Sequence, residues 1–122
     1  MKAYTDISQS KKLAEILPNK GADQTWERVA IAGANLDAPE ELQYIHNGDM
    51  PFQFYSGIGI PCWSLAALLG VLPYPSIHKT FSGWRCDSYN KEATSYILGK
   101  SSDNPVDACY EMILKLKNLN LL

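Results

Sequence analysis

Apolar positions recur at helical spacing in three stretches of the chain. The first begins after a capping residue, Asp6 or Ser8, and ends at Pro18. Its apolar face consists of Leu13, Ala14, Ile16 and Leu17. Aspartate and serine accept hydrogen bonds from the first N–H groups of a helix, and proline cannot continue one. The pattern therefore predicts a helix that ends before residue 18.

The second stretch runs from Pro61 to Leu72 and is followed by Pro73. Proline is tolerated in the first turn of a helix, and a second proline ends it. The apolar positions at spacings of three and four are Cys62, Leu65, Leu69 and Leu72. We therefore expect a helix whose first turn contains Cys62.

The third stretch, SDNPVDACYEMILKLKNLNLL, is the clearest of the three. Asp103 or Asn104 suits the N-cap, Pro105 the first turn, and Asp107 complements the helix dipole. One apolar stripe follows, formed by Val106, Cys109, Tyr110, Ile113 and Leu116. These features predict a C-terminal helix that covers the core.

Between these stretches the alternation changes to a period of two, which is typical of strands. The candidate strands are residues 25–31, 41–46, 52–55, 79–87 and 94–98. The resulting order is helix, two or three strands, helix, two strands, helix. Short connections favour antiparallel pairing. We expect one α+β domain over residues 1–122, with an antiparallel sheet of four to five strands and three helices on one side.

Two short segments resemble each other. LAEILP (Leu13–Pro18) and LLGVLP (Leu68–Pro73) both read Leu-x-x-[Ile/Val]-Leu-Pro, and strand-like sequence follows each of them. A duplicated helix-plus-hairpin unit would produce this repeat. Amphipathic helices that end in proline are also common, so both explanations stay open at this stage.

Composition narrows the class of protein. The 122 residues are 46% hydrophobic and 20% charged, with a net charge of −2, which is typical of a globular chain. The charges are mixed, and the one basic cluster, Lys115 with Lys117, is explained by the dipole of the C-terminal helix, which argues against a nucleic-acid partner. No apolar run has the length of a membrane span, and the N-terminus lacks a secretory signal. Three widely spaced cysteines do not form a disulfide pattern, so we expect a cytoplasmic protein.

Cys62 is the main candidate for chemistry. A thiol at a helix N-terminus has a lowered pKa, and a cysteine hydrolase would pair Cys62 with His46 or His78 as base. The alternative is that Cys62 packs in the core as a small apolar residue. No second motif supports a catalytic pair, so we favour the core interpretation and expect no catalytic residue.

Metal and cofactor motifs are incomplete. Zinc sites contain ligand pairs two to four residues apart, and no histidine or cysteine of this chain has such a neighbour. Gly57 and Gly59 match part of a dinucleotide-binding loop, but its third glycine would fall on a cysteine. We therefore expect neither a metal nor a cofactor.

Aromatic residues are dense in the middle of the chain. Helices cover only one face of the expected sheet, so part of the aromatic set stays exposed on the other face. The residues expected there are Trp84, Tyr55, Tyr96 and Phe52. Exposed tryptophan and tyrosine dominate interface energetics, which predicts a protein partner or self-association. Stacking of single-stranded nucleic-acid bases is the rival use of such a face.

Three segments, DISQSKKLAEILP, IPCWSLAALLGVLP and NPVDACYEMILKL, resemble a group of small uncharacterised proteins encoded on phages and mobile elements of gut bacteria. The resemblance covers about a third of the chain and implies no activity, cofactor or catalytic residue. It implies a mobile-element context. Together with the aromatic residues, it leads us to expect a non-enzymatic accessory protein that binds another macromolecule.

Overall fold

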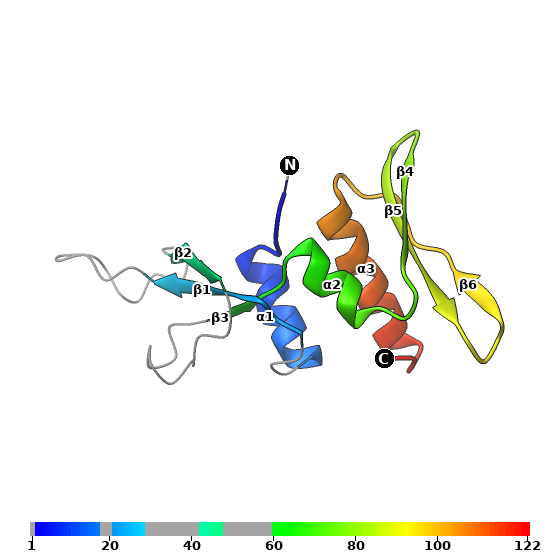
Figure 1. Cartoon of the computed structure of the whole chain (residues 1–122), viewed down its shortest axis with the longest axis horizontal. Helices are drawn as coiled ribbons and strands as arrows, with labels where there is room; N and C mark the ends of the chain where they lie inside the picture. The colour runs from blue at the N-terminus through cyan, green and yellow to red at the C-terminus, as the bar shows by residue number, and fades with distance from the viewer. Residues whose placement is uncertain (1, 18–20, 29–41, 48–59) are drawn as a thin grey trace. The chain divides into compact units, whose positions relative to one another are not determined.

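A computed structural model describes residues 2–17, 21–28, 42–47 and 60–122, and the structural statements below concern these residues. Figure 1 shows the elements in chain order. They are α1 (Ile7–Ile16), β1 (Gln24–Arg28), β2 (Leu42–Asn47), β3 (Ile60–Cys62), α2 (Leu65–Val71), β4 (Ser76–Thr80), β5 (Gly83–Asn90), β6 (Ser95–Ile97) and α3 (Pro105–Asn118).

The α+β class predicted from the sequence is confirmed, but a single sheet of four to five strands is not. The described strands form two antiparallel sheets of three strands each, in the orders β2-β1-β3 and β4-β5-β6. Each sheet has its own central strand, β1 or β5. The candidate strand at residues 52–55 lies outside the described residues.

Contacts within the chain divide it into two compact units. One unit is Asp6–Trp63, which contains α1 and the first sheet. The other combines Met1–Thr5 with Ser64–Leu122 and contains α2, α3 and the second sheet. In both units one helix precedes three strands.

The first helix forms as the sequence predicts, with Asp6 as its N-cap. The Asp6 carboxylate accepts from the Gln9 backbone N–H (2.8 Å), and the Gln9 side chain accepts from the Asp6 N–H (3.1 Å). This reciprocal capping satisfies two N–H groups that a helix end leaves without partners. Leu13 and Leu17, two of the predicted apolar positions, are buried.

The second helix begins four residues later than expected, at Leu65. Residues 60–62 pair with β1 instead, and Pro61 is accommodated because β3 is an edge strand. Ser64 is the N-cap, and its hydroxyl accepts from the Ala67 N–H at 3.2 Å. The prediction that Cys62 belongs to this helix is therefore wrong.

The buried face of α2 also differs from the prediction. Leu68 and the C-cap Leu72 are buried, with 0% and 5% of their surface exposed, whereas Leu65 and Leu69 are half-buried. At about 100° per residue these four leucines lie on one side of the helix, so the buried face is the predicted one with its centre moved to Leu68 and Leu72.

The C-terminal helix matches the prediction closely. Asn104 caps it by accepting from the Asp107 N–H (2.9 Å), and Pro105 occupies the first turn. Of the predicted stripe, Val106, Cys109, Ile113 and Leu116 are buried and Tyr110 is half-buried. Helix α3 packs against β5 and α2, so this stripe forms the core of its unit. Each buried aliphatic side chain contributes roughly 1.5–3 kcal/mol to stability.

The predicted strand 79–87 is two strands joined by a tight turn at Phe81 and Ser82. Thr80 pairs with Gly83 at the end of the β4–β5 ladder. Gly83 has a φ of +145°, and a Cβ there would lie 2.3 Å from the Ser102 carbonyl oxygen. Only glycine fits this position. The turn that it completes divides residues 79–87, whose alternating apolar and polar positions had predicted a single strand.

Candidate functional site

Cys62, the main sequence candidate for chemistry, is fully buried. It lies in β3 with 0% of its surface exposed and forms no disulfide. The helix N-terminus that would lower its pKa begins two residues later, with Ser64 as the cap. A buried structural thiol is usually inert, because neither water nor substrate reaches it.

The two histidines proposed as its base occupy different places. His46 pairs with Thr25 of β1, whereas Cys62 pairs with Gln24 on the other side of that strand. The two backbones are therefore two strand spacings apart, about 10 Å. His78 lies on β4, in the other compact unit.

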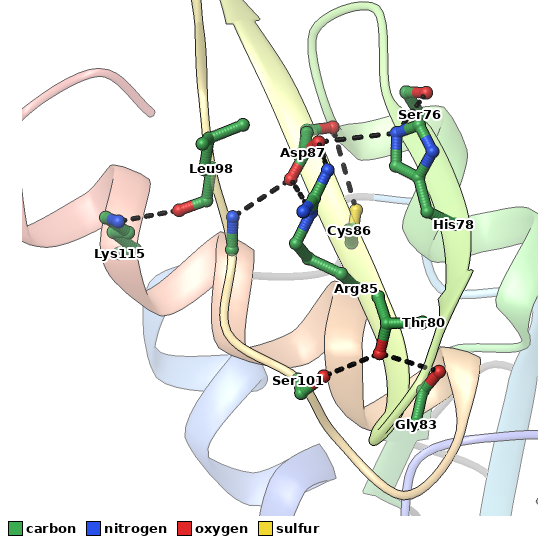
Figure 2. A network of polar contacts seen from close by, with 11 residues as sticks. Ser76, His78, Thr80, Gly83, Arg85, Cys86, Asp87, Leu98, Ser101 and Lys115 are labelled. Carbon is green, nitrogen blue, oxygen red and sulfur yellow. Dashed lines mark hydrogen bonds and ion pairs between the residues drawn. The ribbon is translucent and has the colours of Figure 1, made fainter.

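A polar cluster of the second sheet centres on Asp87, whose side chain is 4% exposed. Arg85 donates two hydrogen bonds to its carboxylate, from Nε (2.9 Å) and an Nη (3.0 Å), and the Gly99 backbone N–H donates a third (3.0 Å). The His78 Nε2 lies 3.3 Å from Asp87 Oδ2, the oxygen that also accepts from the Arg85 Nη. Figure 2 shows Arg85 and His78 pointing toward Asp87.

Asp87 has a structural reason to be buried. The β5–β6 ladder ends at the pair formed by Ser88 and Ile97. The segment after β6 pairs with β5 again only at Trp84 and Ser102, which leaves a gap between the two pairs. The carboxylate bridges this gap by accepting the Gly99 N–H, which would otherwise lack a ladder partner. Arg85 supplies the compensating charge in the bidentate geometry that favours such pairs.

Ser76, His78 and Asp87 resemble a catalytic triad in composition but not in geometry. The Ser76 hydroxyl lies 3.0 Å from His78 Nε2, the same nitrogen that contacts Asp87. In a catalytic triad the serine and the carboxylate contact opposite ring nitrogens, so that the imidazole relays a proton between distinct sites. Asp87 is also neutralised by Arg85. The geometry therefore favours a structural cluster.

Cys86 and Cys109 bring two more buried thiols together, from β5 and α3. A hydrogen bond from the Cys109 thiol lowers the pKa of Cys86, although burial opposes the shift. The same bond, together with burial, raises the pKa of Cys109. Both side chains are 0% exposed, so the pair belongs to the core between the sheet and α3.

Exposed aromatic surface gathers at the other end of the β4–β5 hairpin, around three tyrosines. Tyr89 contacts Tyr74 with ring centroids 6.3 Å apart and Tyr96 with centroids 5.3 Å apart, both edge to face. Tyr74 is 73% exposed and Tyr96 53%, while Tyr89 is half-buried between them. We call these three residues the tyrosine surface.

A cavity of about 240 Å³ adjoins the tyrosine surface. Its lining is mainly apolar and comes from the segment between α2 and β4, from β5, β6 and the turn between them, from α3 and from the residues after α3. The lining residues are Pro73, Tyr74, Tyr89, Asn90, Lys91, Glu92, Ile97, Leu116 and Leu121. A second cavity, of about 350 Å³, lies between α3 and the segment after β6 and includes Leu119.

The aromatic residues predicted to contact a partner lie in different places. Tyr96 belongs to the tyrosine surface. Trp84 is half-buried, with the Lys79 ammonium 5.6 Å from its ring centroid. Tyr55 and Phe52 lie outside the described residues.

Sequence reasoning missed Tyr74, Tyr89 and the Asp87 cluster. Arg85 and Asp87 do carry a signal, because opposite charges two residues apart in a strand lie on one face. In the tyrosine surface the sequence identified only Tyr96. Tyr74 carried no signal, because it precedes β4 and contacts Tyr89 only once β4 pairs with β5.

No group of three or more potential metal ligands lies together among the described residues. In the same part of the chain, no helix is both long enough and apolar enough to cross a bilayer. Comparison of the chain with protein-family models, curated proteins and solved structures found no match.

Proposed function

We propose that this protein is a non-enzymatic interaction module that binds another protein or a second copy of itself through the tyrosine surface. The supporting observation is that Tyr74 and Tyr96 are mostly exposed yet held against Tyr89 by ring contacts. Tyrosine is enriched among residues that dominate binding energy. Rings that are ordered before binding lose less side-chain entropy on association.

The proposal includes a cytoplasmic accessory role in a phage or mobile element. This context rests on the resemblance of three sequence segments to mobile-element proteins. The cysteines at positions 62, 86 and 109 all carry thiols, as is usual in a reducing compartment.

The two rival hypotheses draw less support from the geometry. A hydrolase based on Cys62 requires an accessible thiol, whereas this side chain is fully buried. Single-stranded nucleic-acid binding requires aromatic faces beside a basic groove. The tyrosine surface adjoins a cavity lined by one lysine and one glutamate, so charge does not favour a phosphate backbone.

The test is affinity capture with this chain as bait, from cells that carry the phage or mobile element proposed as its context. Mass spectrometry quantifies each protein that is recovered with it. Replacing both Tyr74 and Tyr96 by serine is expected to reduce recovery of a specific partner at least tenfold, since a lost hot spot costs about 2 kcal/mol. Leu119→Ser is the matched control, because Leu119 is 51% exposed and lines the second cavity rather than the one beside the tyrosine surface. Equal recovery by the double variant and the control would contradict the proposal.

A further inference from the structure

Two of the three thiols contact each other, although a strand and a loop separate them in the sequence. Cys86 lies on β5 and Cys109 on α3, and both side chains are 0% exposed in the core between these elements. The Cys109 thiol donates a hydrogen bond to the Cys86 sulfur. A disulfide requires two side chains that point toward each other at short range, and the hydrogen-bonded thiols meet this requirement.

A neighbouring contact places the same face of α3 beside Cys86 independently of the thiols. A Cβ at Gly99 would lie 2.2 Å from the Cys86 carbonyl oxygen and 3.4 Å from the Met112 Cε. Met112 and Cys109 are both buried residues of α3 and are three positions apart, so they share one face of the helix. This face therefore packs on β5 at the position of Cys86.

The two thiols differ in a way that suits oxidation. The hydrogen bond from Cys109 lowers the pKa of Cys86, although burial and the Asp87 charge oppose the shift. The same bond, together with burial, raises the pKa of Cys109. The thiolate is the form that attacks an oxidant, and a neighbouring thiol then resolves the oxidised sulfur. Cys86 is therefore suited to attack and Cys109 to resolve.

A small reagent can approach the pair from one side. The second cavity, of about 350 Å³, is lined by Gly99 and Met112, the two residues that meet beside the Cys86 backbone. Methionine is unbranched and flexible, so a local movement of this side chain opens a path for a molecule little larger than water. Hydrogen peroxide has that size, whereas iodoacetamide is larger.

We infer that Cys86 and Cys109 form a redox pair, which a peroxide converts to a reversible disulfide between β5 and α3 while Cys62 remains a thiol. The Cys86 thiolate attacks one oxygen of hydrogen peroxide and the O–O bond breaks. The hydroxide that leaves takes up the proton that the Cys86 thiol had lost, and forms water.

The second step joins the two sulfurs. The Cys109 sulfur attacks the sulfenic acid at Cys86, the S–O bond breaks, and the oxygen leaves with the Cys109 proton as a second water. Two thiols and one peroxide thus give one disulfide and two waters. Both sulfurs are oxidised, and both peroxide oxygens are reduced.

The resulting bond ties α3 to the central strand of the second sheet. In a reducing compartment such a bond is transient, because exchange with cellular thiols removes it. The inference does not involve the tyrosine surface, so it and the proposed function can fail separately.

The test is peptide mapping of the folded full chain after treatment with hydrogen peroxide, with the remaining thiols alkylated in denaturant before digestion. We expect a linked peptide pair through Cys86 and Cys109, at least roughly tenfold more abundant than any link to Cys62. Dithiothreitol is expected to restore both thiols. When urea is present during oxidation, links to Cys62 are expected to become comparable, because the preference comes from the fold.

Substitutions separate the roles of the thiols. Cys86→Ala removes the attacking sulfur, so Cys109 is expected to stay a thiol after peroxide treatment. Cys62→Ala, at the third fully buried thiol, is the matched control and is expected to form the disulfide at the wild-type rate. Circular dichroism shows whether each variant is folded, and the wild-type map needs no substitution.

Three results would overturn the inference. The first is a peroxide-treated wild type in which Cys86 and Cys109 both remain open to alkylation. The second is a native map in which links to Cys62 are as abundant as the expected pair. The third is oxidation of Cys109 in folded Cys86→Ala at the wild-type rate.

Discussion

Gly99 lies where the segment after β6 passes close to β5. A Cβ at this position would be 2.2 Å from the Cys86 carbonyl oxygen, so any larger residue must displace backbone. Gly70 is the contrasting case, an exposed glycine inside α2 whose Cβ would meet nothing within 4 Å.

We expect opposite effects from alanine at these two glycines. Gly99→Ala is expected to lower the free energy of unfolding by about 2–3 kcal/mol, as overpacking does. Gly70→Ala is expected to raise it by about 0.5–1 kcal/mol, because alanine favours a helix interior. Urea denaturation measures both, and a Gly99→Ala variant as stable as the wild type would contradict the close approach.

Replacing Asp87 by alanine and measuring the free energy of unfolding tests whether the polar cluster is structural. Asp87→Ala leaves the Gly99 N–H and the Arg85 guanidinium without their acceptor. Arg85 is 34% exposed and regains water, so we expect a loss of about 2–3 kcal/mol rather than the larger cost of a fully buried pair. Asp103→Ala, at an exposed carboxylate, is the control and should change stability by less than about 0.5 kcal/mol. Equal stability of the two variants in urea would contradict this role.

The three thiols provide a prediction about reactivity. Cys62, Cys86 and Cys109 are all 0% exposed, so iodoacetamide is expected to label them slowly at neutral pH in the native protein and rapidly in denaturant. The lowered pKa of Cys86 does not change this expectation, because access limits the reaction. Mass spectrometry after timed labelling measures each site. Rapid native labelling of Cys62 would revive the hydrolase hypothesis.

At the scale of elements, local signals predicted the two longer helices well. Capping residues, Pro105 and the apolar stripe of α3 act within one helix, so the sequence alone carries them. The start of α2 was missed because pairing of residues 60–62 with β1 is a long-range contact. The turn at Phe81 was missed because no Asn-Gly or Asp-Gly pair marks it, and its need for glycine arises from Ser102, far along the chain.

The short repeat suggested by the sequence has a partial structural counterpart. In both copies the first leucine is buried, the last leucine is a buried C-cap, and the cap N–H donates to the first leucine's carbonyl. These residues are Leu13 with Leu17, and Leu68 with Leu72. However, the two sheets connect their strands differently. In chain order the central strand β1 is the first strand of its sheet, whereas the central strand β5 is the second strand of the other sheet. The repeat therefore describes how the two helices end, and it does not extend to the sheets.

The cap of α3 gives a prediction at this scale. Asn104→Ala removes the acceptor for the Asp107 N–H and is expected to cost about 1 kcal/mol of unfolding free energy. Asn118→Ala, at the exposed last residue of the same helix, is the control and is expected to cost less than half as much. Thermal denaturation of the two variants compares them, and equal midpoints would contradict the capping role of Asn104.

At the scale of the whole molecule, the sequence predicted the class but not the division into two sheets. Alternation identifies strands, whereas pairing decides which strands share a sheet, and pairing is not a local property. The same limit applies to the candidate site. The sequence identified Tyr96 as an exposed aromatic residue, but its contact with Tyr89 and the adjoining cavity depend on strand pairing and on α3.

The central claim is that this protein works by contact through the tyrosine surface. The most direct measurement is fluorine NMR of the chain carrying fluorotyrosine at Tyr74, recorded as the partner recovered by affinity capture is added or, if capture recovers the chain itself, as the protein concentration rises. We expect the Tyr74 resonance to shift as the partner is added, and to shift less in Tyr96→Ser, which removes the second exposed ring of the surface. A label at Tyr110, a half-buried residue of α3, serves as the internal reference. A Tyr74 resonance that the partner leaves unchanged in the wild type would contradict the account.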